Sequence, residues 1–292
     1  MAKLLLSFDF EDWHQLVHRG LGRADWDSRG HALERQSAAI LDLLDELGAK
    51  ATFFVLGMTA ERYPDLVQGI AAKGHEVACH GYAHRRVATQ GPDEFRADVD
   101  RCASLLEELT GKRPLGYRAP AFSITRDTPW AYEELTAAGF QYDSSQYDSP
   151  RIPRRLDSIP RAPYRLRTES GAELWELPVA ASRVPVGGGA YWRVLPTAVI
   201  ARTLRSLIAE GALPALYFHP YEFDSEPLRA EGGGAAGTLR GLRRNVARGA
   251  VAGRLRKIAA EFALHPYGTA VKDLAERPGA RSKTLSGAGV LV

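Results

Sequence analysis

Apolar residues recur along the chain with two different periods, and segments of the two kinds alternate. Short, nearly continuous apolar runs such as residues 51–56 predict buried strands, whereas longer segments with apolar residues three or four positions apart predict amphipathic helices. The predicted strands span residues 4–8, 51–56, 75–79, 115–117, 141–142, 174–177, 215–218 and 268–271. The predicted helices span residues 31–47, 59–73, 92–110, 128–138, 197–210 and 251–262, with a long loop before the first. This alternation, in units of roughly thirty residues, predicts an α/β fold built on a parallel sheet, either open or closed into a barrel.

Three further segments lack such a pattern. The stretch 143–191 is rich in Pro, Arg and Gly and is expected to hold loops and short strands, and the glycine-rich segment 231–237 is expected to be a mobile loop. The polar, glycine-containing end of the chain is expected to be weakly ordered. Since the sequence has no internal repeat and no long linker, we expect one domain over residues 1–276 and a tail over residues 277–292.

Composition and charge narrow the class of protein. Of the 292 residues, 45% are hydrophobic and 25% are charged, as in an ordinary globular domain. The 38 Lys and Arg nearly balance the 35 Asp and Glu, and a net charge of +3 argues against a nucleic-acid partner. Two cysteines do not make a disulfide scaffold, and Cys79 is expected in the core.

The apolar stretches also bear on location. None approaches the ~20 apolar residues that a membrane span requires. The apolar run near the N-terminus is too short for a signal peptide, because acidic residues follow it at once. We therefore expect a cytoplasmic protein without a membrane span.

Unusual polar residues follow several of the predicted strands. Since the carboxyl ends of parallel strands share one face, these residues are expected to converge. They are Asp9, Glu11 and Asp12 after the first strand, His80 and His84 after the third, Arg118 after the fourth, and His219 after a late one. Histidines and carboxylates gathered with an arginine are typical of a metal hydrolase site.

The histidines and acids each allow two interpretations. His80 and His84 are four residues apart, so they either bind one metal ion together or are ordinary surface or capping residues. The acids provide either a metal ligand and a general base, or a polar strand exit that caps the next helix. His219 is either an exposed corner residue before Pro220 or a core histidine. Imidazole and carboxylate ligands suit Zn, Co, Ni, Fe or Mn, so the metal is not determined.

Four short motifs occur in the order found in the polysaccharide deacetylase superfamily (carbohydrate esterase family 4, the NodB-homology domain). They are Asp9-Phe-Glu-Asp12, His80-Gly-Tyr-Ala-His84, Arg118-Ala-Pro120 and Leu216-Tyr-Phe-His219. The chain resembles this family over about residues 3–275. It departs from the family pattern at Gly81, where Ser or Thr is usual, and in the acids, which the family places side by side.

The resemblance implies a distorted (β/α) barrel of about seven parallel strands that binds one divalent metal ion, zinc being expected first. His80 and His84 would be metal ligands. A carboxylate would complete the set: an Asp-x-acid arrangement in some branches of the family favours Glu11, and Asp12 is the alternative.

The resemblance also implies catalytic roles. Asp9 would be the general base, Arg118 would hold the carboxylate of Asp9, and His219 would be the general acid. Pro120 belongs to the arginine motif and is expected to contribute to substrate binding.

Aromatic and glycine residues suggest further substrate contacts. Tyr147, Tyr191 and Trp192 either stack on sugar rings or pack in the core. The run Gly187–Gly189 either lets the backbone approach a ligand or forms an ordinary loop. The stretches 187–193 and 219–224 resemble a branch of the family found with exopolysaccharide biosynthesis loci.

The expected function is therefore removal of N-acetyl groups from amino sugars of a cell-wall glycan or exopolysaccharide. Two alternatives remain: an amide hydrolase of the same fold that acts on small cyclic ureides or imides, and a carbohydrate-binding protein with a decayed site. The sequence leaves open whether the acetylated glycan is a polymer or a small precursor, and whether the protein forms an oligomer.

Overall fold

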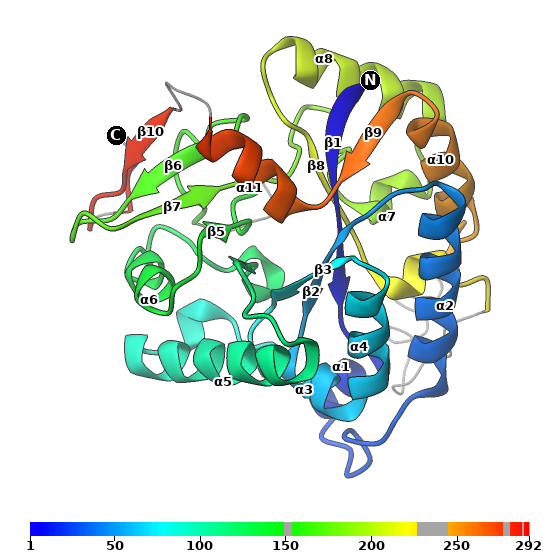
Figure 1. Ribbon diagram of the computed structural model, residues 1–292, viewed down its shortest axis with the longest axis horizontal. Helices are drawn as coiled ribbons and strands as arrows, with labels where there is room; N and C mark the ends of the chain where they lie inside the picture. The colour runs from blue at the N-terminus through cyan, green and yellow to red at the C-terminus, as the bar shows by residue number, and fades with distance from the viewer. Residues whose placement is uncertain (149–153, 227–244, 277–280, 288, 292) are drawn as a thin grey trace.

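One sheet of ten strands runs through the described part of the protein, with helices packed around it (Figure 1). This computed structural model describes residues 1–148, 154–226, 245–276, 281–287 and 289–291. The strands are β1 (Ala2–Phe10), β2 (Thr52–Val55), β3 (Glu76–Cys79), β4 (Gly116–Tyr117), β5 (Tyr142–Asp143), β6 (Tyr164–Arg167), β7 (Glu173–Glu176), β8 (Ala215–Phe218), β9 (Phe262–His265) and β10 (Ser282–Thr284). Their order is β10-β6-β7-β5-β4-β3-β2-β1-β8, and β9 also pairs with β1. All pairs are parallel except β6 with β7.

Seven of these strands close into a barrel. The chain after β7 forms a parallel bridge to β8 between Val179 and Ala215, and the Ala180 N–H donates to the Ala215 carbonyl over 2.9 Å. The ring therefore contains β1, β2, β3, β4, β5, β7 and β8. This confirms the predicted distorted barrel of about seven parallel strands. The distortion is visible in β4 and β5, which have two residues each, and in a seam made of isolated bridges.

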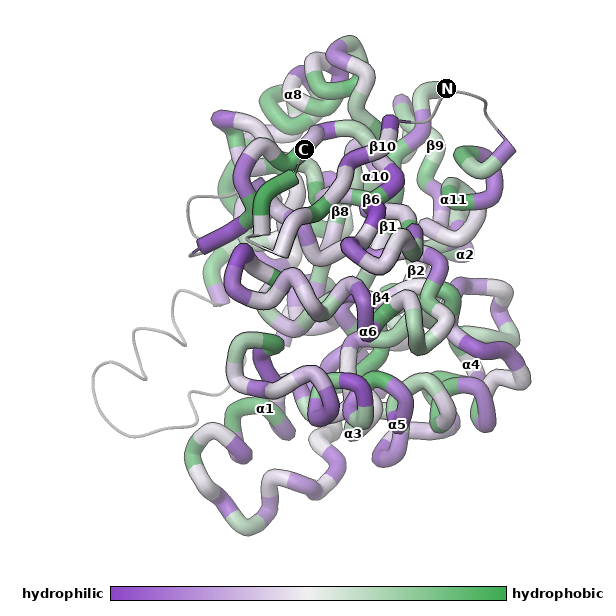
Figure 2. The backbone as a smooth tube through the Cα atoms, turned by 90° about the vertical axis from the view of Figure 1, so that its left-hand side faces the viewer, coloured by the Kyte–Doolittle hydropathy of each residue, from purple (hydrophilic) through white to green (hydrophobic). Residues whose placement is uncertain are grey.

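Helices cover the outside of the barrel. They are α1 (Trp13–Gly20), α2 (His31–Glu46), α3 (Gly57–Arg62), α4 (Pro64–Ala72), α5 (Pro92–Thr110), α6 (Ala131–Ala137), α7 (Gly189–Trp192), α8 (Thr197–Ala209), α10 (Ala250–Ala259) and α11 (Tyr267–Ala275), with short 3₁₀ turns η1 (Val87–Thr89), η2 (Pro120–Phe122) and η3 (Pro220–Phe223). In Figure 2 hydrophilic and hydrophobic residues follow one another along α5, as expected for a helix with one face on the barrel. No helix among the described residues combines the length and the apolar character that crossing a membrane would require.

Side chains alternate between the two faces of each barrel strand, and this alternation prepares the site. On β1, Leu6 and Phe8 pack in the large core cluster beneath the helices, whereas Leu5 belongs to a cluster inside the barrel. Tyr267 and Ala270 of α11 join that inner cluster and close the end of the barrel at which the strands begin. The inner side chains near the carboxyl ends of the strands therefore remain available to form a site.

Two predicted elements in the first half of the chain require correction. The predicted helix 59–73 is two helices, because Pro64 begins α4 and has no N–H with which to continue α3. The predicted long loop after β1 contains α1, and the Asp12 side chain caps its first turn by accepting from the His14 N–H.

One prediction near the C-terminus is wrong. Residues 268–271 lie in α11, where Tyr267, Ala270 and Val271 are buried at helical spacing, and the strand there is β9. Within the predicted tail, residues 282–284 form β10 beside β6, and Leu285 and Leu291 are buried. The glycine-rich segment 231–237 lies outside the described residues.

Candidate active site and metal centre

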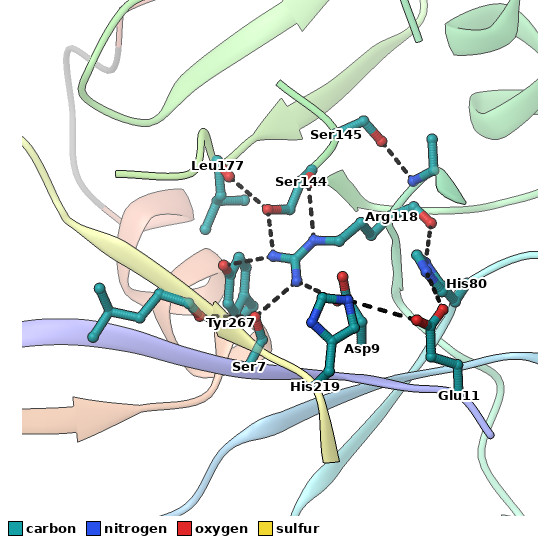
Figure 3. Close-up of polar contacts among 12 residues, drawn as sticks. Ser7, Asp9, Glu11, His80, Arg118, Ser144, Ser145, Leu177, His219 and Tyr267 are labelled. Carbon is teal, nitrogen blue, oxygen red and sulfur yellow. Dashed lines mark hydrogen bonds and ion pairs between the residues drawn. The ribbon is translucent and has the colours of Figure 1, made fainter. Parts of the chain in front are cut away.

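The period-two alternation brings polar side chains together inside the carboxyl end of the barrel (Figure 3). Asp9 lies two residues after the inward-facing Ser7 on β1, and His219 lies two residues after Tyr217 on β8. His80 follows β3 and Arg118 follows β4. All the predicted catalytic residues therefore meet at one end of one barrel, as the sequence suggests.

Glu11, His80 and His84 form a group that fits a metal ion. One donor atom from each lies within 4.8 Å of the others. The Glu11 Oε2 atom is 3.1 Å from Nε2 of His84 and 3.9 Å from Nε2 of His80. Burial acts to raise the pKa of Glu11, but the hydrogen bond from His84 and the charges of the neighbouring histidines lower it to about 2. An ionised carboxylate with two imidazoles is a ligand set that suits zinc and similar ions.

The backbone fixes the orientation of both histidines. Nδ1 of His80 lies 2.7 Å from the Arg118 carbonyl oxygen, so it carries the proton and leaves Nε2 to face Glu11. Gly81 and His84 have φ of 75° and 52°, and a Cβ on Gly81 would lie 3.0 Å from the Asp98 carboxylate, which accepts the Tyr82 N–H over 2.7 Å. This close approach is the physical reason for glycine in the second motif. Asp98 was not identified from the sequence, since it lies in the middle of α5.

Asp12 is separated from this group. Its Oδ1 atom accepts from the His14 N–H over 2.9 Å, and its Oδ2 atom accepts from the Tyr63 hydroxyl over 2.7 Å. One oxygen thus caps the start of α1, and the other joins this turn to Tyr63, the residue before α4. Of the two acids considered as ligand, the structure places Glu11 beside the histidines.

Asp9 is held by the fully buried Arg118. The guanidinium uses all five of its N–H groups: it donates to Asp9 (2.7 Å), Ser7 Oγ (2.8 Å), the Tyr267 hydroxyl (2.8 Å), and both Oγ (2.9 Å) and the carbonyl (3.1 Å) of Ser144. An arginine satisfied in this way is rigid, and it holds the Asp9 carboxylate in one direction. Ser7, Ser144 and Tyr267 were not identified from the sequence, because hydroxyl residues at such positions carry no distinctive pattern.

His219 lies beside the other carboxylate oxygen of Glu11. Its Nε2 atom is 3.6 Å from Glu11 Oε1, and its Nδ1 atom is 3.8 Å from Oε2 of Glu222, which also accepts the His219 N–H over 3.0 Å. Burial acts to lower the pKa of His219, but Glu222, Glu11 and Asp9 raise it to about 9. Glu222 was also missed. Its signal is an acid three residues after His219, with Pro220 between, which is the spacing of a capping box.

Two of the expected substrate contacts are core residues instead. Trp192 is fully buried; its indole N–H donates to the Val186 carbonyl over 2.7 Å, and its ring lies 5.1 Å from that of Phe218. Tyr147 is also buried and packs against Phe122 at 5.5 Å. These aromatic rings lie inside the protein because the residues around them are apolar, so neither is available to stack on a sugar.

The remaining expected contacts are placed as follows. Pro120 is buried and begins η2, next to Gly81. Tyr191 is half-buried in α7, and its contact with substrate stays a prediction. The run Gly187–Gly189 is needed for packing: a Cβ on the last glycine would lie 2.0 Å from the Glu222 carboxylate.

A second group with metal-like donors lies on α1. It comprises His14, His18 and Asp25. Nδ1 of His18 lies 3.0 Å from the Asp25 carboxylate, and its Nε2 lies 3.4 Å from the guanidinium of Arg23. A positive guanidinium at this distance disfavours a cation, so this group is better described as a polar cluster around the buried His18.

Comparison with family models divides the chain in two. A family model for polysaccharide deacetylases matches residues 27–141, and a domain family of unknown function (DUF3473) matches residues 144–272. His80, His84 and Arg118 lie in the first segment, and His219 lies in the second. Asp9 and Glu11 precede both segments, so their assignment rests on the geometry described above.

Individual proteins are similar to the chain in part. The peptidoglycan deacetylase-like protein FGM2 of Gibberella zeae is 39% identical over 150 residues, which are 49% of this chain and 44% of the relative. The chain thus matches less than half the length of this curated relative. A Mycobacterium smegmatis crystal structure assigned as a polysaccharide deacetylase has a TM-score of 0.66 at 23% identity and covers 94% of this chain and 90% of its own. The crystal structure of Puue allantoinase has a TM-score of 0.61 at 18% identity, with coverages of 95% and 91%. At these identities the two structures show the shared fold.

Proposed function

Since the chain belongs to the polysaccharide deacetylase superfamily, we propose that it is a metal-dependent hydrolase that removes N-acetyl groups from amino sugars of a poly- or oligosaccharide. The observation that carries this proposal is the metal-like group Glu11, His80 and His84, which lies beside the Asp9–Arg118 pair and His219. The peptidoglycan deacetylase-like relative supports a cell-wall glycan as the substrate. The stretches that resemble the exopolysaccharide branch support an exopolysaccharide.

We assign the metal to Glu11, His80 and His84. The three donor atoms are close enough to share one ion, and the carboxylate is ionised at neutral pH. These residues would hold a divalent ion, zinc first and Co, Ni, Fe or Mn as alternatives, which would supply polarisation of the acetyl carbonyl and a lowered pKa for a water molecule. Recognition of the sugar would depend on the residues around the metal site.

The side chains around that group divide the proton transfers between them. Asp9 takes a proton from the water that adds to the acetyl carbonyl carbon, and Arg118 fixes the direction of this carboxylate. His219 donates a proton to the amide nitrogen, so that the C–N bond breaks and acetate and a free amine are formed. The raised pKa of His219 suits an acid that must be protonated at neutral pH.

The Asp9→Asn substitution tests the assigned base. Asparagine keeps the size of the side chain and accepts from Arg118, but it cannot take up a proton. We expect kcat for acetate release to fall by roughly 10³-fold or more while zinc still binds stoichiometrically. Asp42→Asn, a change on the outer helix α2, is the matched control. Near-normal turnover of Asp9→Asn would show that another group is the base.

The reaction class is tested with three substrates in parallel. Acetate release from chito-oligosaccharides and from peptidoglycan fragments is measured alongside ring opening of a small cyclic ureide, each with and without a chelator. We expect acetate release that chelation abolishes. Ureide opening without acetate release would contradict the proposal, as would stoichiometric zinc with no turnover of any N-acetyl glycan.

A further inference from the structure

Two buried acidic side chains lie next to each other on neighbouring strands of the barrel. Asp143 of β5 is in register with Glu176 of β7, and both are fully buried. Their carboxyl groups hydrogen-bond to each other, and burial raises the pKa of both. Two carboxyl groups in contact in a dry environment hold one proton between them, because both cannot ionise. The chemistry proposed above uses neither group.

The remaining negative charge lies on Asp143. Its two oxygens accept from the Ser145 N–H over 2.8 Å and from the Ser145 hydroxyl over 2.7 Å, and the positive charge of Arg118 favours its ionised form. Glu176 accepts from the Gln146 N–H over a longer 3.2 Å. Glu176 is therefore the protonated partner, and it donates to Asp143.

A continuous chain of hydrogen bonds leads from Asp143 to His80, and its part from Ser145 to His80 can be followed in Figure 3. The Ser145 hydroxyl donates to Asp143 and accepts from the Ala119 N–H over 2.8 Å. That N–H belongs to the peptide group between Arg118 and Ala119, whose carbonyl oxygen accepts from Nδ1–H of His80 over 2.7 Å. Every donor in the chain points toward Asp143, and hydrogen bonds aligned in this way strengthen one another.

We propose that Asp143, held by Glu176, is a positioning residue that acts on His80 through Ser145 and the Arg118–Ala119 peptide group. The inference rests on the proposed function in one respect, the role of His80 as a metal ligand. The chain draws the Nδ1 proton of His80 toward the carbonyl, which fixes the ring and makes Nε2 a stronger electron donor. A carboxyl pair that only joined β5 to β7 would affect stability and leave His80 unchanged.

The Ser145→Ala substitution cuts the chain at its middle. Ser37→Ala is the matched control, because Ser37 is also buried and its hydroxyl donates to the Leu33 carbonyl within α2, away from the site. We expect Ser145→Ala to bind Zn²⁺ about tenfold more weakly than the wild type, measured by competition with a chelating indicator, and Ser37→Ala to bind it unchanged. Equal affinities of Ser145→Ala and wild type would overturn the proposal.

A second measurement needs no metal. In the metal-free protein labelled with ¹⁵N-histidine, the Nδ1 proton of His80 is expected to resonate upfield in Ser145→Ala relative to the wild type, because its hydrogen bond loses the support of the chain. An unchanged resonance would overturn the proposal. A wild type that bound no zinc would contradict the proposed function alone, and this resonance would still decide the role of Asp143.

The two acids are distinguished by amide substitutions. Glu176→Gln keeps a donor toward Asp143 and an acceptor for Gln146, so zinc affinity is expected to stay at the wild-type value. Asp143→Asn removes the charge and is expected to weaken zinc binding at least as much as Ser145→Ala does. The opposite order of effects would overturn the assignment of the charge to Asp143. If Asp143→Asn does not fold, Ser145→Ala still decides the matter.

Discussion

A single buried residue beside the proposed acid, Glu222, favours the charged form of that acid. Glu222 is nearly fully buried, and its carboxylate accepts the backbone N–H of His219 and faces the imidazole. Arg193 lies 3.5 Å from the other oxygen, and Gly189 leaves the space that the carboxylate fills. The proposed acid thus depends on a carboxylate that is itself buried.

The Glu222→Gln substitution separates the charge of this residue from its shape. Glutamine still accepts the His219 N–H, so the position of the imidazole is kept, but the charge that stabilises its protonated form is lost. We expect kcat for acetate release to fall by about tenfold to a hundredfold, with little change in KM. Glu226→Gln, an exposed change nearby, serves as the control. Full activity of Glu222→Gln would mean that the proposed acid works without this charge.

Sequence reasoning reached the principal residues of the site and missed those that support them. Histidines, acids and an arginine after strands are rare enough to stand out, so Asp9, His80 and Arg118 were found. The choice between Glu11 and Asp12 depended on where the chain turns into α1, which local pattern does not reveal. The sequence leaves open whether Trp192 stacks on a sugar or packs in the core, because burial of an aromatic ring is decided by tertiary packing.

Strand β3 begins next to a histidine that has an uncommon environment. His75 is buried, its Nδ1 accepts a long hydrogen bond from the Ala51 N–H, and its Nε2 has no hydrogen-bond partner. Burial and the nearby charge of Lys50 lower the pKa of His75 from 6.5 to about 4. The element therefore folds with this imidazole neutral.

The stability of the protein is expected to depend on pH through this histidine. Between pH 6.5 and about 4 the unfolded chain binds a proton at His75 and the folded protein does not, so the free energy of unfolding falls as the pH falls. The effect amounts to about 3 kcal/mol at most, since one pKa unit corresponds to about 1.4 kcal/mol.

Urea unfolding of the wild type and of His75→Phe at pH 7 and pH 4.5 measures this contribution. Other titrating groups act equally on both proteins, so the difference between the two proteins isolates His75. We expect the wild type to lose more stability than the variant on acidification. Parallel losses would show that His75 is already protonated when folded.

Elements with strong periodicity were predicted well, and those fixed by packing were not. The bounds of α5 and β8 agree with the predicted ranges, because their apolar residues keep one period throughout. The segment that forms α11 contains small and β-branched residues that favour neither structure clearly. It is helical because its buried face closes the start of the barrel, a contact between distant parts of the chain.

The molecule as a whole consists of a closed ring of seven strands and additions outside it. Strand β10 pairs with β6, and β6 is itself outside the ring. The buried Leu285 and Leu291 attach this end of the chain to the rest. The candidate site lies within the ring and takes no side chain from this addition.

Removal of residues 277–292 tests this division. The loss of two buried leucines is expected to lower the free energy of unfolding by about 3–6 kcal/mol, since burying one leucine contributes about 1.5–3 kcal/mol. Zinc affinity is expected to stay at the wild-type value, because the proposed ligands follow strands of the ring. Isothermal titration and urea unfolding of the shortened protein measure the two quantities. A shortened protein that is stable but has lost its zinc would place β10 in the support of the site.

Two of the five hydrogen bonds that Arg118 donates go to Ser144, one to its carbonyl oxygen and one to its hydroxyl. Arg118 lies in the segment that the first family model matches, and Ser144 lies in the segment that the second one matches, so the border between the two segments separates them. That border is therefore a poor place for recombination. A chimera joined there would take Arg118 from one parent and Ser144 from the other, so the hydrogen bond from Arg118 to a side chain at position 144 would form only where the second parent also has an acceptor there.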